Sequence, residues 1–434
     1  MRSLRQKELK LMPAGERLPG VAGPSTGRDE APVRKEDGPG RARRFILLCA
    51  NFGGNLGDRL IFDNTVAWLR SAWPGCEIVV SPLAGREGTA ENRDLMAGNY
   101  DVTIAEPFGA TCRPHAFFQA CCPPAAGRIL GPMLFHKLSR RAAASALARW
   151  FHGADAVFAI GGNWSGFSQI MVVLSLLDAA LQARSQVAVL PVSLPVNMPA
   201  GLQSVFPGIV AKTGAFAVRD PASLRIARSL GIRHAALFPD MAFAVPCPAP
   251  APRRASRCIR IGICLRISRE RIRPEDLARV AGALAGLRRD DCSITVFTSH
   301  ERDDAESIRR LREAAFEFDV VTPESVNELF DLVSDFDLVV SDRLHALIVS
   351  TLVGTPIVPV MSLPKVTGYV EYIGYPLSVP DFIDLRWDRH IAPAVAKRNE
   401  LREHLAAFAA DACRELRNLG KHVGKCMDLP AGDS

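Results

Sequence analysis

An arginine and a histidine stand two positions apart in the segment Ser341-Asp342-Arg343-Leu344-His345-Ala346. The segment follows an apolar run typical of a buried strand and opens an apolar pattern typical of a helix. Both side chains are therefore expected at the carboxyl edge of a strand, beside the free backbone N–H groups of a helix start. Arginine offers a fixed fork for a carboxylate or phosphate, and a histidine held beside an anion keeps its proton and can serve as a general acid. A structural alternative, in which Arg343 pairs with Asp342 and His345 caps the helix, fits the segment equally well.

Arg219 is a second candidate for holding an anion. It follows a short apolar run and precedes Asp220-Pro221, residue types expected at a helix N-cap and at the first helical position. The positive end of the helix dipole repels a cation, so a purely structural arginine is unfavourable there. We therefore interpret Arg219 as a ligand of a bound anion. Asp240 has a simpler interpretation, because its carboxylate can satisfy backbone donors at a strand end.

Lys365 follows a later strand, on what should be the same edge of the sheet. Its ammonium group would add positive charge to an anion pocket. A solvated lysine is the alternative, and the local sequence does not decide between the two.

Two glycine-containing turns also follow predicted strands, Gly53-Gly54-Asn55-Leu56-Gly57-Asp58 and Gly161-Gly162-Asn163. Neither has the Gly-Lys-Ser/Thr ending of a P-loop, and their spacing misses the dinucleotide-binding fingerprint. The carboxylate of Asp58 can cap the next helix or accept a hydrogen bond from a sugar hydroxyl. Helix capping is likewise the alternative for Asn163. We expect five residues of these turns to bind substrate: Asn55, Asp58, Gly161, Gly162 and Asn163.

The elements that must position these residues alternate between short apolar runs and helical patterns. The first half has predicted strands at 44–50, 76–81, 100–105, 154–160 and 187–192, with helices at 59–72 and 168–184. The second half has predicted strands at 260–265, 293–298, 318–321, 338–340 and 357–360, with helices at 274–288, 304–315, 326–333, 344–353 and 398–419. This alternation indicates parallel strands joined by crossover helices. Segment 106–145 does not fit it and is interpreted as an insertion.

The chain of 434 residues exceeds what one hydrophobic core usually spans, so we expect more than one domain. A polar, Gly- and Pro-containing stretch opens the chain, and a Pro-rich break separates the two halves. The predicted organisation is a flexible leader, an N-terminal α/β domain, a linker, a C-terminal α/β domain, and a final helix with its tail: 1–43, 44–245, 246–257, 258–385 and 386–434. We expect an α/β fold of two doubly wound, Rossmann-like domains that face a cleft, with the ligand at their junction.

Composition restricts the partners. The formal net charge of +7 favours anionic ligands. Nucleic acid is not expected, because the arginines are not interleaved with aromatic residues. The 11 cysteines show no zinc-type pair spacing, so we expect no metal site.

The sequence also bears on localisation. The first residues lack the apolar core of a secretion signal, and the apolar stretch 170–181 is too short to cross a bilayer, so a cytoplasmic protein is expected. The basic charge leaves open a peripheral contact with the inner membrane face, although no amphipathic anchor is convincing.

The candidate motifs, taken in order, resemble the polysaccharide pyruvyl transferase family over about residues 44 to 380. The motifs that carry the resemblance are Gly54-Asn55-Leu56-Gly57-Asp58, Gly161-Gly162-Asn163, Val218-Arg219-Asp220, Pro239-Asp240, Ser341-Asp342-Arg343-Leu344-His345-Ala346 and Gly354-Thr355-Pro356 with Lys365. The resemblance implies a fold similar to the type B glycosyltransferases. It also implies phosphoenolpyruvate as the donor substrate, no separate cofactor, and a glycan or lipid-linked saccharide of a surface or exopolysaccharide precursor as the acceptor.

The resemblance further implies roles for three residues. Arg219 and Arg343 would hold the donor's carboxylate and phosphate, and His345 would be the general acid that protonates the donor's methylene carbon as a sugar hydroxyl attacks. Phosphate then leaves, and a second hydroxyl closes a pyruvate ketal. Segments 298–304 and 106–145 depart from the family pattern, which leaves the acceptor unspecified.

Two other functions stay open at this point. A nucleotide-sugar-dependent glycosyltransferase would share the architecture but needs a nucleoside pocket in the second domain. A non-enzymatic glycan-binding or assembly protein would keep its function when His345 is replaced by alanine.

Overall fold

The computed structural model describes residues 42–50, 55–82, 102–104, 147–160, 162–164, 167–245, 258–266, 273–314 and 318–429. Residues 1–41 of the predicted leader, the predicted linker 246–257 and the predicted insertion 106–145 lie outside the described residues. Residues 37–434 make up one compact unit, in which the described strands form two sheets.

The first sheet has seven parallel strands in the order β3-β2-β1-β4-β5-β6-β7. The strands are β1 Arg44–Ala50, β2 Glu77–Pro82, β3 Thr103–Ile104, β4 Ala156–Ala159, β5 Gln186–Val192, β6 Ala215–Val218 and β7 Ala235–Leu237. The helices of this half are α1 Leu56–Ala72, η1 Arg149–Phe151, α6 Phe167–Gln182, α7 Ala200–Gln203, α8 Phe206–Val210, α9 Pro221–Ser229 and η2 Met241–Phe243.

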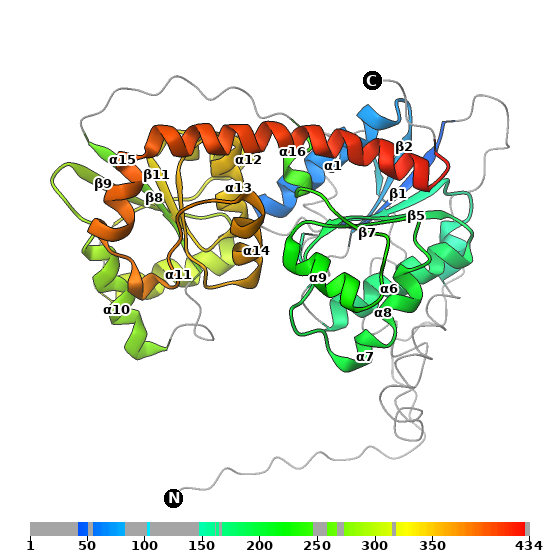
Figure 1. Cartoon of the computed structure of the whole chain (residues 1–434), viewed down its shortest axis with the longest axis horizontal. Helices are drawn as coiled ribbons and strands as arrows, with labels where there is room; N and C mark the ends of the chain where they lie inside the picture. Colours follow the sequence, from blue (N-terminus) through cyan, green and yellow to red (C-terminus); the bar gives the residue numbers. More distant parts are fainter. Residues whose placement is uncertain are drawn as a thin grey trace, which may run out of the picture. The chain divides into compact units, whose positions relative to one another are not determined.

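Both faces of this sheet are buried. Phe45 and Leu47 of β1 belong to a core cluster that includes α1, whereas Ile46 and Leu48 belong to a cluster that includes α6 and α8. Successive side chains of a strand point to opposite faces, so an uninterrupted apolar run is what a sheet covered on both sides requires. Figure 1 shows helices covering both faces.

The second sheet has five parallel strands in the order β10-β9-β8-β11-β12. The strands are β8 Ile259–Cys264, β9 Cys292–Phe297, β10 Asp319–Val321, β11 Leu338–Ser341 and β12 Ile357–Pro359. The helices are α10 Pro274–Ala285, α11 Glu301–Glu313, α12 Val326–Asp335, α13 Leu344–Leu352, α14 Pro364–Ile373, η3 Phe382–Asp384, η4 Trp387–Ile391 and α15 Ala392–Ala396.

Both sheets reverse their strand order next to the first strand. In the first sheet β1 lies between β2 and β4, and in the second β8 lies between β9 and β11. Open α/β sheets bind ligands outside the carboxyl ends of their strands at such a reversal. In the second sheet these ends are Cys264 of β8 and Ser341 of β11, so Arg343 and His345 follow directly at the reversal.

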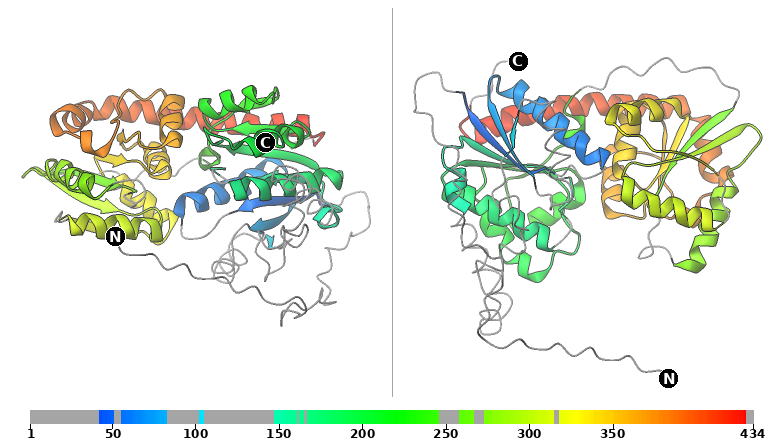
Figure 2. Two further views of the ribbon diagram at one scale, coloured as in Figure 1. Left: turned by 90° about the horizontal axis from the view of Figure 1, so that it is seen from below. Right: turned by 180° about the vertical axis from the view of Figure 1, so that it is seen from behind.

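Helix α16 (Arg398–Cys426) contacts elements that pack on both sheets. Near its start, His404 Nε2 lies 2.8 Å from the carbonyl oxygen of Ile373, at the end of α14. Further along, the indole nitrogen of Trp68 in α1 donates to the carbonyl oxygen of Leu416 over 2.9 Å. Figure 2 shows α16 from two further directions. The helix therefore ties α1 of the first half to α14 of the second.

The structure confirms the predicted fold class of two doubly wound parallel α/β sheets, and it moves several element boundaries. Helix α1 begins at Leu56 rather than at residue 59, and the last helix continues to Cys426 rather than ending at residue 419. Helix α14 has no counterpart among the predicted elements. The division into separate domains stays a prediction. Within the described part of the chain, no helix has the length and hydropathy to cross a membrane.

Candidate active site

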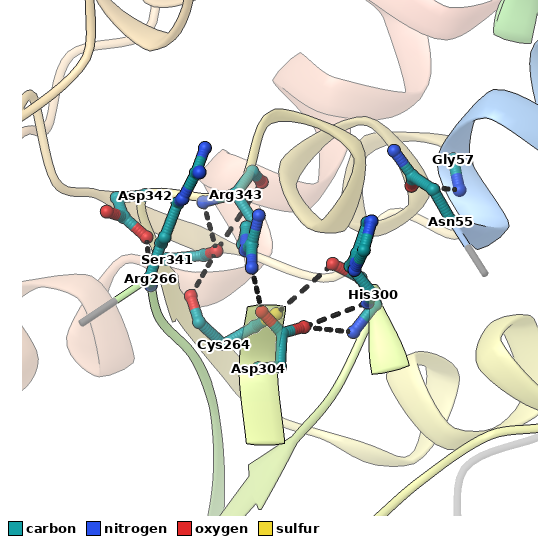
Figure 3. A network of polar contacts seen from close by, with 10 residues as sticks. Asn55, Gly57, Cys264, Arg266, His300, Asp304, Ser341, Asp342 and Arg343 are labelled. Atoms are coloured by element: carbon teal, nitrogen blue, oxygen red, sulfur yellow. Dashed lines mark hydrogen bonds and ion pairs between the residues drawn. The ribbon is translucent and has the colours of Figure 1, made fainter. Parts of the chain in front are cut away.

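Arg343 is fixed by hydrogen bonds at the end of β11. Its backbone N–H donates to Ser341 Oγ over 2.8 Å, and that hydroxyl donates to the carbonyl oxygen of Cys264 over 2.6 Å. The Arg343 guanidinium pairs with the carboxylate of Asp304 in α11, and both side chains are buried (Figure 3). Asp342 accepts instead from the backbone N–H of Arg266, over 2.9 Å. Arg343 thus pairs with an aspartate of another element.

His345 lies one residue inside α13 and is buried. The alternative in which it caps the helix is wrong, because Arg343 occupies the N-cap position. The imidazole packs so closely on Gly57 of α1 that a Cβ there would lie 1.9 Å from His345 Nδ1. Its Nε2 is buried and has no hydrogen-bond partner among the described residues.

The surroundings of His345 disfavour its charged form. The pKa of His345 is lowered to about 3, mainly by burial and in addition by the nearby cations Arg219, Lys365 and Arg343, while Asp240 opposes the shift. The imidazole is therefore neutral at neutral pH in the protein by itself. A bound anion would be needed for it to hold a proton there.

Arg219 is a buried side chain at the end of β6. Its Nε donates to Ser193 Oγ over 2.8 Å, and its Nη1 donates to Asp240 Oδ2 over 2.5 Å. Gly162 lies against the guanidinium, since a Cβ at this position would be 2.7 Å from Arg219 Nη1. The carboxylates of Asp240 and the neighbouring Asp220 balance the positive charge that the helix dipole would otherwise repel.

The predicted cap of the helix after Arg219 is present. Asp220 is the N-cap residue of α9, and its Oδ1 accepts from the backbone N–H of Ser223 over 2.7 Å. Asp240 accepts from the backbone N–H of Ala242 over 2.9 Å, as expected, and in addition it pairs with Arg219.

Lys365 stands in the first turn of α14 and is partly buried, so the solvated lysine is the wrong alternative. The pKa of Lys365 is lowered to about 8, mainly by burial and in addition by Arg219 and Arg343, while Asp58 opposes the shift. Burial raises the pKa of Asp58, and Lys365 opposes that shift. These mutual effects place the lysine and the aspartate in one electrostatic cluster with the two arginines.

Two residues of the first turn act on the start of α1. Asn55 is its N-cap residue, and its Oδ1 accepts from the backbone N–H of Gly57 over 3.0 Å. Its side-chain amide donates to Asp58 Oδ2 over 2.9 Å. The capping role considered for Asp58 therefore belongs to Asn55.

The second turn supports Arg219 through the backbone. Ser193 donates its N–H to the carbonyl oxygen of Gly162 over 3.1 Å, and Asn163 pairs with Ser193 in a parallel bridge. Ser193 in turn contacts Arg219 and Asp220. Gly161 lies outside the described residues.

A small pocket joins the two halves at these side chains. It is lined by Ser193, Arg219, Asp220, Asp240, Phe243, Leu344, Ile348, Lys365, Tyr369 and Tyr372. Arg219 directly follows β6 of the first sheet, while Leu344, between Arg343 and His345, belongs to α13 of the second half. Of the four predicted residues, Arg219 and Lys365 line this pocket. Arg343 and His345 flank its Leu344, and the charges of Arg219, Lys365 and Arg343 all act on His345. Among the described residues no group of three or more His, Cys, Asp or Glu side chains could hold a metal ion.

Two residues of the site were not predicted from the sequence. Asp304 pairs with Arg343, and Ser193 holds Arg219. Asp304 could have been recognised from the sequence as a candidate, because it is an acidic residue in the first turn of a helix that follows a strand. Ser193 carries none beyond its place after β5.

Comparisons with known proteins agree with this architecture. The family model described as polysaccharide pyruvyl transferase matches residues 55–362. Among curated protein sequences, none matches the chain.

Solved structures show the same fold at low sequence identity. Anabaena Alr3699/HepE in complex with UDP and glucose is 10% identical, with a TM-score of 0.55 over 89% of this chain and 99% of that one. The S. aureus MnaA–UDP co-structure is 11% identical, with a TM-score of 0.55 over 89% and 97% of the two chains. A glycosyltransferase from Rickettsia africae is 10% identical, with a TM-score of 0.54 over 89% and 99%. Because the family model covers most of the chain, the protein belongs to the polysaccharide pyruvyl transferase family, whose enzymes transfer pyruvate to a polysaccharide.

Proposed function

We propose that the enzyme takes its pyruvyl group from phosphoenolpyruvate and forms a pyruvate ketal on two hydroxyls of one sugar in a polysaccharide precursor. The observation that carries the proposal is a buried histidine, without a hydrogen-bond partner at Nε2 among the described residues, inside a cluster of cations. Such a cluster suits a small substrate with several negative charges.

Arg219 and Arg343 are proposed to hold the donor's carboxylate and phosphate. Each guanidinium is already oriented by a carboxylate, Asp240 and Asp304 respectively, so little reorganisation is needed when the donor binds. A guanidinium has five N–H donors, and Ser193 and Asp240 engage only the Nε and Nη1 of Arg219. Lys365 lines the same pocket as Arg219 and adds a third positive charge that interacts with both arginines.

His345 is proposed as the general acid. It gives its proton to the methylene carbon while the first sugar hydroxyl forms a bond to the adjacent carbon and loses its own proton. The bond to phosphate then breaks, phosphate leaves with the electron pair, and loss of a methyl proton gives an enol ether. Reprotonation and attack by the second hydroxyl close the ketal, so that phosphoenolpyruvate and a diol give a ketal and phosphate.

The start of α1 is proposed as the acceptor side. Asn55 and Asp58 are the polar side chains there, and Asp58 is assigned to receive a hydrogen bond from the attacking hydroxyl. The turn Gly161-Gly162-Asn163 is proposed to add backbone contacts to the sugar.

We also propose that the enzyme acts in the cytoplasm, where phosphoenolpyruvate is produced. The acceptor is then a cytoplasmic glycan or a lipid-linked saccharide reached by peripheral contact with the inner membrane face, which the net charge of +7 would favour. Sedimentation with vesicles of anionic and of neutral lipid tests the membrane contact, and equal recovery with both argues against it.

The reaction itself is tested in D2O with phosphoenolpyruvate and a panel of saccharides that carry diols. Phosphate release together with a ketal methyl group containing at least one deuterium is the expected result. Release of a nucleoside diphosphate from UDP-glucose, with no reaction of phosphoenolpyruvate, would instead support the nucleotide-sugar glycosyltransferase. Unchanged function in His345→Ala would support the glycan-binding protein.

The donor site is tested with a pair of arginine variants. Arg219→Gln is expected to lower kcat/KM for phosphoenolpyruvate by about 100-fold or more, as removal of one preorganised donor does. Arg225→Gln is the matched control, because Arg225 lies on the neighbouring helix α9 and pairs with Glu371 in exposed positions. Equal effects of the two changes would remove Arg219 from the donor site.

A further inference from the structure

Asp304 contacts two separate parts of the molecule through one buried carboxylate. Its Oδ1 pairs with the guanidinium of Arg343 at the start of α13. Its Oδ2 accepts from the backbone N–H groups of Ser299 and His300, over 2.7 and 2.9 Å. Only 3% of the Asp304 side chain is exposed, so these bonds are shielded from water.

The turn that Asp304 holds is itself bound to the first half of the chain. Ser299 accepts from the backbone N–H of Leu56 over 3.1 Å, and His300 pairs with Asn55 in an antiparallel bridge. Asn55 and Leu56 form the start of α1. Asp304 is therefore linked, through this one backbone bridge, to the start of the helix that carries Asn55 and Asp58.

We propose that Asp304 is a positioning residue that holds Arg343 and the Ser299-His300 turn in register, so that the donor side and the start of α1 keep a fixed relation. The inference rests on the proposed function for the role of Arg343 toward the donor. The connection to α1 does not depend on that role, because it consists of hydrogen bonds within the chain.

The chemistry of a carboxylate explains why an aspartate serves here. Two oxygens can accept one charge-assisted bond from a guanidinium and two bonds from backbone N–H groups at the same time. An asparagine has only one carbonyl oxygen. Its amide nitrogen donates hydrogen bonds, so it cannot bind the backbone N–H groups or the guanidinium, which are also donors. Asp304→Asn therefore keeps the shape of the side chain but loses its hydrogen bonds either to Arg343 or to the Ser299-His300 turn.

Two measurements on the full chain test the proposal. Hydrogen–deuterium exchange of the Leu56 amide reports on the bond to Ser299, and Asp304→Asn is expected to speed this exchange by about 10-fold. Calorimetric titration of phosphoenolpyruvate into single and double variants reports on Arg343. Asp304→Asn is expected to weaken donor binding by about 10-fold, and this effect should vanish in the Arg343→Gln background, as a double-mutant cycle for interacting residues shows.

The control is Asp63→Asn on α1, where Asp63 pairs with Arg59 away from the pocket lining. Its effect on donor binding, if any, should add to that of Arg343→Gln. Should Asp304→Asn fail to fold, Asp304→Glu keeps the charge but displaces it by one methylene, and the same two readouts apply.

Unchanged exchange at Leu56, or additive effects of the changes at Asp304 and Arg343, would overturn the proposal. Failure of phosphoenolpyruvate to bind the unaltered enzyme would contradict the proposed function instead, while the exchange measurement would still decide whether Asp304 holds the turn.

Discussion

Donor binding should load a proton onto His345. The pKa of this imidazole is about 3 because it is buried among cations. Phosphoenolpyruvate carries a carboxylate and a phosphate, about two to three negative charges near pH 7. Its arrival beside Arg219, Arg343 and Lys365 would reverse the sign of the field at the imidazole.

The size of the shift follows from Coulomb's law. One negative charge about 5 Å from the imidazolium, at an effective dielectric constant of about 20, stabilises it by about 3 kcal/mol, or about 2 pKa units. Two such charges can therefore bring His345 from a pKa of about 3 to near its ordinary value of about 6.5. Between the two pKa values binding takes up one proton, so this group makes binding stronger as the pH falls within that window.

Calorimetry at pH 7 in buffers of different ionisation enthalpy measures this uptake directly. The unaltered enzyme is expected to take up about 0.2 proton or more at His345 when the bound pKa lies near 6.5 or above. The His345→Gln variant should lose this proton uptake. It should keep only the small uptake by the donor phosphate and by Lys365, whose pKa of about 8 leaves it mostly charged at pH 7. The same uptake in both proteins would refute the assignment of His345 as the acid.

Three further changes give separate readouts. Gly57→Ala should lower kcat/KM by about 10-fold or more with little change in donor affinity, because the added Cβ would lie 1.9 Å from His345 Nδ1 and must displace the ring; steady-state kinetics with calorimetry would show otherwise if the ring can yield. Lys365→Met should abolish the loss of donor affinity that the unaltered enzyme shows as the pH rises through about 8, and a persisting loss in titrations from pH 7 to 9 would assign it elsewhere. Since the unfolded chain binds a proton at His345 below pH about 6.5 and the folded chain only near pH 3, urea unfolding at pH 5 should show about 2 kcal/mol less stability from this group than at pH 7, a difference that His345→Gln should remove. An equal decrease in both proteins would show that other groups cause it.

The sequence predicts the fold well where local patterns determine it. Uninterrupted apolar runs such as 44–50 become the buried strands of parallel sheets, because both faces need apolar side chains. Helix α14 escaped prediction because Gly368, in its interior, weakens its helical pattern. A Cβ at Gly368 would approach the Asp220 side chain to 3.0 Å, a tight contact that exists only in the folded chain.

The sequence likewise predicts only those residues of the candidate site that local patterns determine. The patterns of helix and strand residues predicted that Arg219, Arg343 and His345 follow strand ends. In the structure the three residues lie close enough for the arginines to lower the pKa of His345. The carboxylates that pair with the two arginines could not be predicted, because Asp304 lies 39 residues before Arg343 and Asp240 lies 21 residues after Arg219. No periodicity links residues so far apart, and only the meeting of separate strand ends brings each carboxylate to its arginine.

The pairing pattern explains how one pocket can both bind and protonate an anion. Each arginine has its own buried carboxylate, so it stays charged and oriented whether or not the donor is bound. The His345 Nε2 has no hydrogen-bond partner among the described residues, and the pKa of this imidazole lies far below neutrality. A histidine with its own carboxylate would hold its proton at all times and give it up less readily, whereas here the charge of the donor itself would supply the counterion. The proton would then arrive with the substrate and leave with the product, since neutral His345 is restored once phosphate departs.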